Sequence, residues 1–174
     1  MISKIKQNAS VFAFLSFAIC SLLLSCTSNE GNDIPGIDEF EYTSVLFDEP
    51  SIAILTDYAK ANNPWNTTDD ITYSCNHMTI HHYLHEDNIG AWDWCMEHVG
   101  DTIDLRATTV GYTDHCFAME IETDIPVTSG VPHTTLIVNN TNGGEAWESK
   151  LIENWKPLDK EIKLRGVVTF HRRK

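Results

Sequence analysis

Three cysteines in the middle of the chain each have a histidine close by, and together these residue types could bind a metal ion. The three pairs are Cys75 with His77, Cys95 with His98, and His115 with Cys116. Thiolate sulfur and imidazole nitrogen are ligands suited to zinc and copper. The six residues are therefore a candidate zinc or copper site, provided that folding brings the pairs together.

The secondary structure around the first pair limits what it could bind. His77, His81 and His85 are spaced by four residues in a segment rich in Thr, Tyr and Ile, which favours a β-strand. Four residues of strand span roughly 13 Å, too far for one ion with ligand bonds of about 2.1 Å. Only neighbours two apart, Cys75 and His77, could then share a metal. The alternative is no cofactor, with exposed histidines beside a disulfide.

The cysteines also raise the questions of a disulfide and of a nucleophile. In an oxidising compartment, three domain cysteines predict one disulfide and one free thiol, and the spacings leave the pair open. A cysteine activated by a histidine would make the protein an enzyme. The chain contains no Gly-x-Ser-x-Gly, His-Glu-x-x-His, Cys-x-x-Cys or phosphate-loop motif. We therefore expect no catalytic residue and keep a cysteine-dependent enzyme as an alternative.

Two tryptophans are candidates for ligand binding. Trp65 lies in a predicted loop after Asn63 and Pro64, and Trp94 follows Asp93 on the predicted outer face of a helix. Exposed tryptophans beside Asn or Asp can stack on sugar rings while the polar groups bond hydroxyls. Both residues are therefore candidate glycan contacts, the alternative being that they pack in the core.

The N-terminus has the features of an export signal. Lysines precede an apolar run of about 14 residues, shorter than the roughly 20 of a membrane-spanning helix. The run ends in Leu23-Leu24-Ser25-Cys26, which resembles the lipobox of bacterial lipoproteins cut by signal peptidase II. That resemblance implies cleavage before Cys26 and acylation of its thiol, for example with palmitate. Residues 1–25 are then the signal peptide.

Residues 26–40 are polar, acidic and rich in turn formers, which predicts a flexible tether. Acidic residues soon after the cysteine resemble the surface-export signal of Bacteroidetes lipoproteins. Asp101-Thr102-Ile103 similarly resembles the O-glycosylation site of that phylum. These resemblances imply a lipid anchor in the outer membrane of the cell envelope, exposed on the surface or, alternatively, facing the periplasm.

Residues 41–174 are long enough for a single domain with a core. Charge is unevenly distributed, because residues 150–174 contain eight basic and three acidic side chains within a chain of net charge -13. A basic C-terminal segment packed against an acidic body explains this pattern; contact with a polyanion is the alternative. The overall acidity argues against a nucleic-acid partner.

The pattern of apolar residues predicts an α+β domain dominated by β-strands. We expect helices after Pro50 and over 91–99, one long strand over 71–84, and further strands over 42–47, 103–110, 116–122, 134–138 and 162–170. Residues 146–155 fit a helix with Trp147, Leu151 and Trp155 inward, or a return strand. The expected architecture is an antiparallel sheet or sandwich with one or two short helices.

These features together predict a membrane-anchored lipoprotein that works as a noncatalytic binding or assembly module for a glycan or a protein of the envelope. The alternatives are a Cys/His metal-binding lipoprotein and an enzyme with a cysteine nucleophile. No family resemblance extends to residues 27–174.

Overall fold

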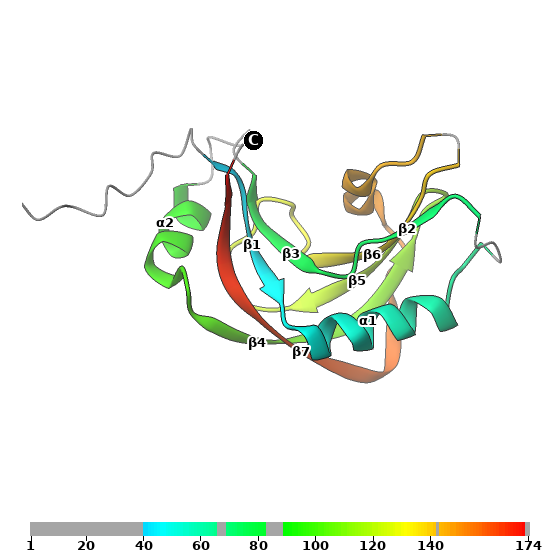
Figure 1. Ribbon diagram of the computed structural model, residues 1–174, viewed down its shortest axis with the longest axis horizontal. Helices are drawn as coiled ribbons and strands as arrows, with labels where there is room; N and C mark the ends of the chain where they lie inside the picture. Colours follow the sequence, from blue (N-terminus) through cyan, green and yellow to red (C-terminus); the bar gives the residue numbers. More distant parts are fainter. Residues whose placement is uncertain (1–39, 66–68, 83–88, 142, 173–174) are drawn as a thin grey trace, which may run out of the picture. The chain divides into compact units, whose positions relative to one another are not determined.

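The computed structural model describes residues 40–65, 69–82, 89–141 and 143–172. Cys26, the predicted signal peptide and almost all of the predicted tether lie outside the described residues. The order of elements in this part is β1 (Phe40–Phe47), α1 (Glu49–Ala61), β2 (Ile71–Tyr73), β3 (His77–His82), α2 (Ile89–His98), β4 (Thr102–Tyr112), β5 (Cys116–Glu122), β6 (His133–Asn139), η2 (Ala146–Leu151) and β7 (Lys156–Arg172) (Figure 1). No helix among the described residues is long and apolar enough to cross a membrane.

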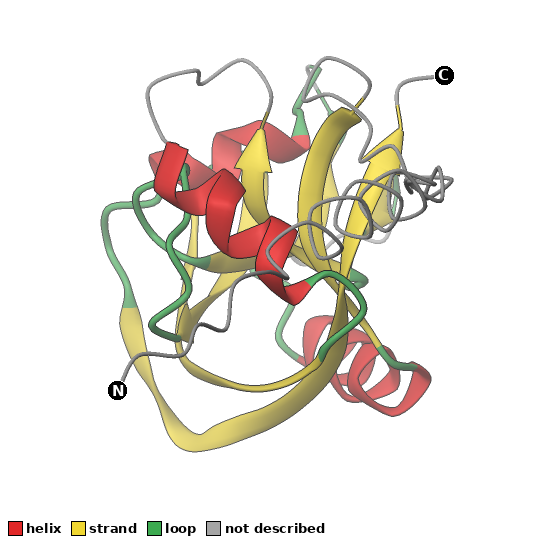
Figure 2. Ribbon diagram, turned by 90° about the vertical axis from the view of Figure 1, so that its left-hand side faces the viewer, coloured by secondary structure: helices red, strands yellow, loops and turns green. Residues whose placement is uncertain are grey.

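The strands form one antiparallel sheet with the order β2-β6-β5-β4-β7-β1-β3. Figure 2 shows how strongly the strands curve. β2 and β3 are the two edges of this sheet, yet only residues 74–76 separate them in the chain. Because four residue steps reach at most about 14 Å, the curvature brings the two edges close together. The sheet remains open and does not divide into two packed layers, so a sandwich is not confirmed.

Backbone hydrogen bonds hold the two edges in this position. The Ser74 N–H donates to the Leu136 carbonyl at 2.9 Å, and the Thr128 N–H donates to the Ile80 carbonyl at 2.9 Å. The predicted strand over 71–84 is therefore wrong as a single element. It breaks at residues 74–76, and its two parts pair with opposite edges, β2 with β6 and β3 with β1.

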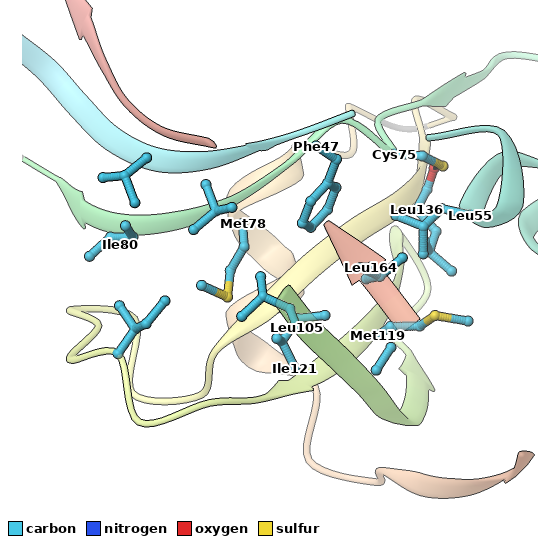
Figure 3. Close-up of a cluster of buried hydrophobic side chains, with 14 of the residues drawn as sticks. Phe47, Leu55, Cys75, Met78, Ile80, Leu105, Met119, Ile121, Leu136 and Leu164 are labelled. Carbon is cyan, nitrogen blue, oxygen red and sulfur yellow. Dashed lines mark hydrogen bonds between the residues drawn. The ribbon is translucent and has the colours of Figure 1, made fainter. Parts of the chain in front are cut away.

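The core fills the inside of this curve. Side chains from β1 and β3, among them Phe47 and Met78, point toward Leu105 of β4 and Ile121 of β5 (Figure 3). Leu55 extends the same cluster from α1 and is completely buried. Alternating buried positions along the strands explain this arrangement, because successive side chains point to opposite faces.

Helix α1 is fixed at its start by its sequence. Asp48 caps it by accepting a hydrogen bond from the Ser51 N–H at 2.9 Å, and Pro50 occupies the first turn, where its missing N–H costs nothing. Leu55 and Ala59 face the core, while Ile54 is 47% exposed. The predicted amphipathic helix after Pro50 is confirmed, and its outer side is left facing solvent beside β7.

Strand β7 has an irregularity where it pairs with β4. Pro157 pairs with Thr109 of β4, and Ile162 pairs with Ala107, so four residues of β7 stand opposite one of β4. The extra residues, 158–161, leave the ladder as a wide bulge, and such bulges redirect side chains. The bulge turns this part of β7 toward the outer side of α1, and residues from both elements line one hollow.

Candidate functional site

The three cysteines of the predicted metal set lie in separate surroundings. The Cys75 thiol donates to the Leu136 carbonyl at 3.2 Å, the Cys95 sulfur lies 3.1 Å from Thr43 Oγ1, and the Cys116 thiol donates to the Glu145 carbonyl at 3.1 Å. All three are buried and free, so the structure contains none of the disulfides that these cysteines could form.

Burial also makes the thiols poor nucleophiles. It raises the pKa of the Cys95 thiol to about 11, and together with the charge of Glu148 it raises the pKa of Cys116 to about 11. The pKa of Cys75 is raised for the same main reason, loss of solvation. Since the thiolate is the reactive form, these cysteines lack the low pKa of catalytic or metal-binding thiols.

The three histidines of the set have partners other than the cysteines. His77 Nδ1 lies 2.7 Å from Asn76 Oδ1, His98 Nδ1 lies 2.8 Å from the Trp94 carbonyl, and His115 Nδ1 lies 2.9 Å from a carboxylate. Among the described residues, no group of three His, Cys, Asp or Glu side chains could hold a metal ion. The structure therefore does not assemble the predicted set of six ligands.

The sequence pattern does not reveal a cluster of rings from β1, β3 and β7. His171 stacks on Tyr42 with centroids 4.0 Å apart, and its Nε2 lies 2.8 Å from Ser44 Oγ. His77 is 6.4 Å from His171, and its pKa is lowered to about 4, chiefly by burial and then by the neighbouring histidine charges. Cross-strand pairing of Tyr42 with His171 creates the cluster, and the 128 residues between them hide it from the sequence.

Neither predicted ligand-binding tryptophan is displayed on an open surface. Trp65 is half-buried and packs against the core, and Trp94 does the same while stacking on His98 with centroids 4.2 Å apart. Pro64, directly before Trp65, does line a surface hollow. The structure therefore favours packing roles for both rings. The hollow lined by Pro64 lies next to Trp65 in the chain.

The exposed tryptophan is Trp147, which was expected to point inward. Residues 146–151 form a 3₁₀ helix instead of the longer helix or strand, and Trp147 and Leu151 are each 53% exposed. The four-residue spacing is therefore misleading here, because a turn of 3₁₀ helix contains three residues. The Trp147 indole donates to Glu145 Oε2 at 2.6 Å, and this bond fixes the ring on the surface.

A hollow of about 190 Å³ lies between the C-terminal end of α1, the end of β4 and the start of β7. Tyr58 of α1 and Asn62, the C-cap of that helix, line one side of it. Tyr112, Asn154 and Lys156 line the opposite side. The Tyr58 ring is held against Phe117 with centroids 6.4 Å apart and planes inclined by 19°.

A second, wider hollow of about 730 Å³ adjoins the first and shares Tyr58 and Asn62 with it. Its walls are Ile54 on α1 and the bulge of β7, including Leu158 and Ile162. We call the two hollows together the α1 cleft. Its lining combines apolar and aromatic side chains with polar and charged ones.

Charge in the α1 cleft comes from the strand side. Lys160, Lys163, Asp159 and Glu161 line the wider hollow, and Lys156 lines the smaller one. The Tyr58 hydroxyl has a raised pKa, mainly from burial and then from Asp159, so it stays protonated and able to donate a hydrogen bond. The cleft can therefore offer aromatic faces, hydroxyl and amide groups, and cations.

Sequence reasoning did not identify the α1 cleft. Its one visible sign was the basic C-terminal segment, because Lys156, Lys160 and Lys163 all belong to residues 150–174.

Comparison of the chain with models of known protein families gives no match. The search of curated proteins gives no significant match either.

Proposed function

We propose that the protein is a noncatalytic binding module of the cell envelope, anchored by lipid on Cys26, that recognises a glycan chain in the α1 cleft. The observation that carries this proposal is the lining of the cleft. Tyr58 and Tyr112 provide aromatic surface, and Asn62 and Asn154 provide amides. Aromatic faces stack on sugar rings, while amides bond hydroxyls.

Tyr112 is the central residue of this proposal. It is 53% exposed at the end of β4, so its ring is open to a ligand without a change in the fold. Tyr58, in contrast, is packed against Phe117 and forms a rigid surface between the two hollows. A linear chain can therefore lie across Tyr58 with units on both sides.

The size of the cleft leaves room for an oligosaccharide. The wider hollow, about 730 Å³, lies within the usual range of roughly 300–1,000 Å³ for ligand pockets. The smaller hollow, about 190 Å³, adds a separate compartment. Two connected compartments of different size suit a ligand built from linked units.

The α1 cleft supports binding better than it supports the two alternatives. The buried thiols with raised pKa values weaken the hypothesis of a cysteine nucleophile. The separated cysteine and histidine pairs weaken the hypothesis of a zinc or copper cofactor bound by the predicted set.

A pair of tyrosine variants tests glycan recognition. The full-length lipoprotein, purified in detergent, would be applied to an array of bacterial and plant oligosaccharides. We expect Tyr112→Ala to lose binding to the oligosaccharide that the wild type retains. Tyr73→Ala is the matched control, since Tyr73 is 37% exposed on β2 and does not line the cleft. No retention of any oligosaccharide, or equal loss in both variants, would overturn the proposal.

The anchor is tested separately. Wild-type cells fed labelled palmitate should incorporate label into the protein, and the Cys26→Ala variant should not. Protease treatment of intact cells would then distinguish the outer surface from the periplasmic face. Equal labelling of wild type and variant would contradict lipidation at Cys26.

A further inference from the structure

We infer that the α1 cleft selects an acidic glycan, one whose sugar units carry an anionic group that binds Lys156. This inference rests on the proposed function and adds the chemical class of the ligand. It starts from the charge balance of the chain, which has 25 acidic and 12 basic residues. A site in such a chain would be expected to be lined by carboxylates.

The smaller hollow departs from that expectation. Lys156 is its one charged lining residue, and the other lining side chains are neutral, among them Asn62, Tyr112 and Asn154. No ion pair of Lys156 is found in the part of the chain that the structure describes. The ammonium group is therefore available to an anionic ligand at a position surrounded by hydrogen-bonding neutral groups.

The wider hollow is also less acidic than its sequence implies. Lys160 and Lys163 line it together with Asp159 and Glu161. Glu161 points its charge elsewhere, because its Oε2 forms an ion pair of 3.6 Å with Arg106 on β4. Over both hollows the lining has three lysines, Lys156, Lys160 and Lys163, against two carboxylates.

The fold explains how basic side chains come to lie along this cleft. Lys156 pairs in register with Val110 at the start of β7, opposite the C-terminal end of α1. The bulge over residues 158–161 then carries further lysines past the outer side of the helix. The basic C-terminal segment thus provides one wall of the cleft, and the neutral face of α1 provides the other.

The rest of the surface determines what kind of anion can approach. With a net charge of -13, the protein as a whole repels a densely charged polyanion. A neutral chain with carboxylates or sulfates at intervals avoids most of this repulsion and still places one anion on Lys156. Lysine binds either group as a point charge.

Matched oligosaccharides would test this inference by calorimetry on the full-length protein in detergent. The probes are a galactan oligomer with galacturonate units at intervals, the same oligomer with those carboxylates reduced to alcohols, and a galactan oligomer sulfated at intervals. We expect the wild type to bind an acidic oligomer about tenfold more tightly than the reduced one, since a hydrogen bond to a charged group contributes about that factor. The preference should shrink as NaCl is raised.

Substitutions then assign the effect to one lysine. Lys156→Gln should weaken binding of the acidic oligomer about tenfold and leave binding of the reduced oligomer unchanged, while Lys156→Arg should retain the preference. Lys150→Gln is the control, because Lys150 lies 5.1 Å over the Trp147 ring and does not line the cleft. Whether carboxylate or sulfate is preferred follows from the two acidic probes.

Three results would overturn the inference in distinguishable ways. Equal affinity for acidic and reduced oligomers, with Tyr112→Ala still abolishing binding, would leave the proposed function standing and remove the acidic ligand. Absence of binding to all three oligomers and to the array would remove both. An oligoglutamate peptide that bound as tightly as the acidic sugars, and lost that affinity in Lys156→Gln, would show that the partner is an acidic protein segment.

Discussion

Shortening Leu55 to alanine should destabilise the protein far more than the same change at the adjacent Ile54. Leu55 is completely buried, whereas Ile54 is 47% exposed and lines the α1 cleft. Each substitution removes three carbons, worth about 0.8 kcal/mol each when buried. For Leu55 this gives about 2.4 kcal/mol, and the remaining cavity brings the loss of unfolding free energy to roughly 3 kcal/mol.

The cost at Ile54 is smaller for two reasons. About half of its side chain already contacts water, so its transfer contribution falls to about 1 kcal/mol. Alanine also has a higher helix propensity than isoleucine, which returns roughly 0.4 kcal/mol. The net loss is then roughly 0.6 kcal/mol, and the two variants should differ by about 2.5 kcal/mol.

Thermal and chemical unfolding followed by circular dichroism would measure this difference. In a domain of this size each kcal/mol shifts Tm by roughly 3–5 °C, so we expect Leu55→Ala to melt about 8–12 °C below Ile54→Ala. Urea midpoints should shift in the same order without a change in m. Equal shifts, or a larger one for Ile54→Ala, would refute the assignment of the buried and cleft-lining sides of α1.

Four further predictions concern other residues. In a variant with Cys20 and Cys26 replaced by serine, Ellman's reagent without reductant should detect no rapidly reacting thiol in the folded protein and three thiols in guanidinium. Detection of one thiol in guanidinium would reveal a disulfide. The free energy of unfolding of the same variant should fall between about pH 9 and pH 11. In this range the buried thiols stay protonated because their pKa values are raised, whereas the thiols of the unfolded chain ionise. Glu148→Gln should lower Tm at pH 7. Because the pKa of Glu148 is depressed in the folded protein, its ionised side chain stabilises the fold above about pH 4.5, and this contribution is lost on further acidification. A difference in Tm between wild type and variant that stays constant with pH would contradict this. Gly111→Ala should cost about 1–3 kcal/mol, since the new Cβ would collide with Ile152 Cγ2, and adding Ile152→Leu, which lacks that methyl, should restore part of the loss in urea unfolding.

The parts of the fold that depend on local sequence could be predicted. Asp48 and Pro50 predict the start of α1, and the alternation of apolar residues in β5 predicts a strand. The break at residues 74–76 could not be predicted in this way. It follows from the curvature of the entire sheet. The residues of a continuous β-type segment do not indicate that its first half will pair with β6 and its second half with β1.

The candidate site could be predicted even less. Lys156, Tyr112 and Tyr58 come from three elements and meet only because β7 pairs with β4 beneath α1. The proximity of cysteine to histidine in the sequence suggested a metal site, but Cys95 turned toward Thr43 and His98 toward the Trp94 carbonyl. Neighbours along a helix or strand share a ligand only when the backbone points them the same way.

The position of β7 in the sheet sets the order in which the protein can complete its fold. β7 is the last strand in the described part of the chain, yet it lies between β1 and β4. Until residues 156–172 are present, strand pairing gives two groups, β1 with β3, and β4 with β5, β6 and β2. A chain that emerges from its N-terminus, during synthesis or export, therefore cannot join these two groups before residues 156–172 arrive. Loss of β7 would leave β1 and β4 each with an unpaired edge in place of one continuous sheet.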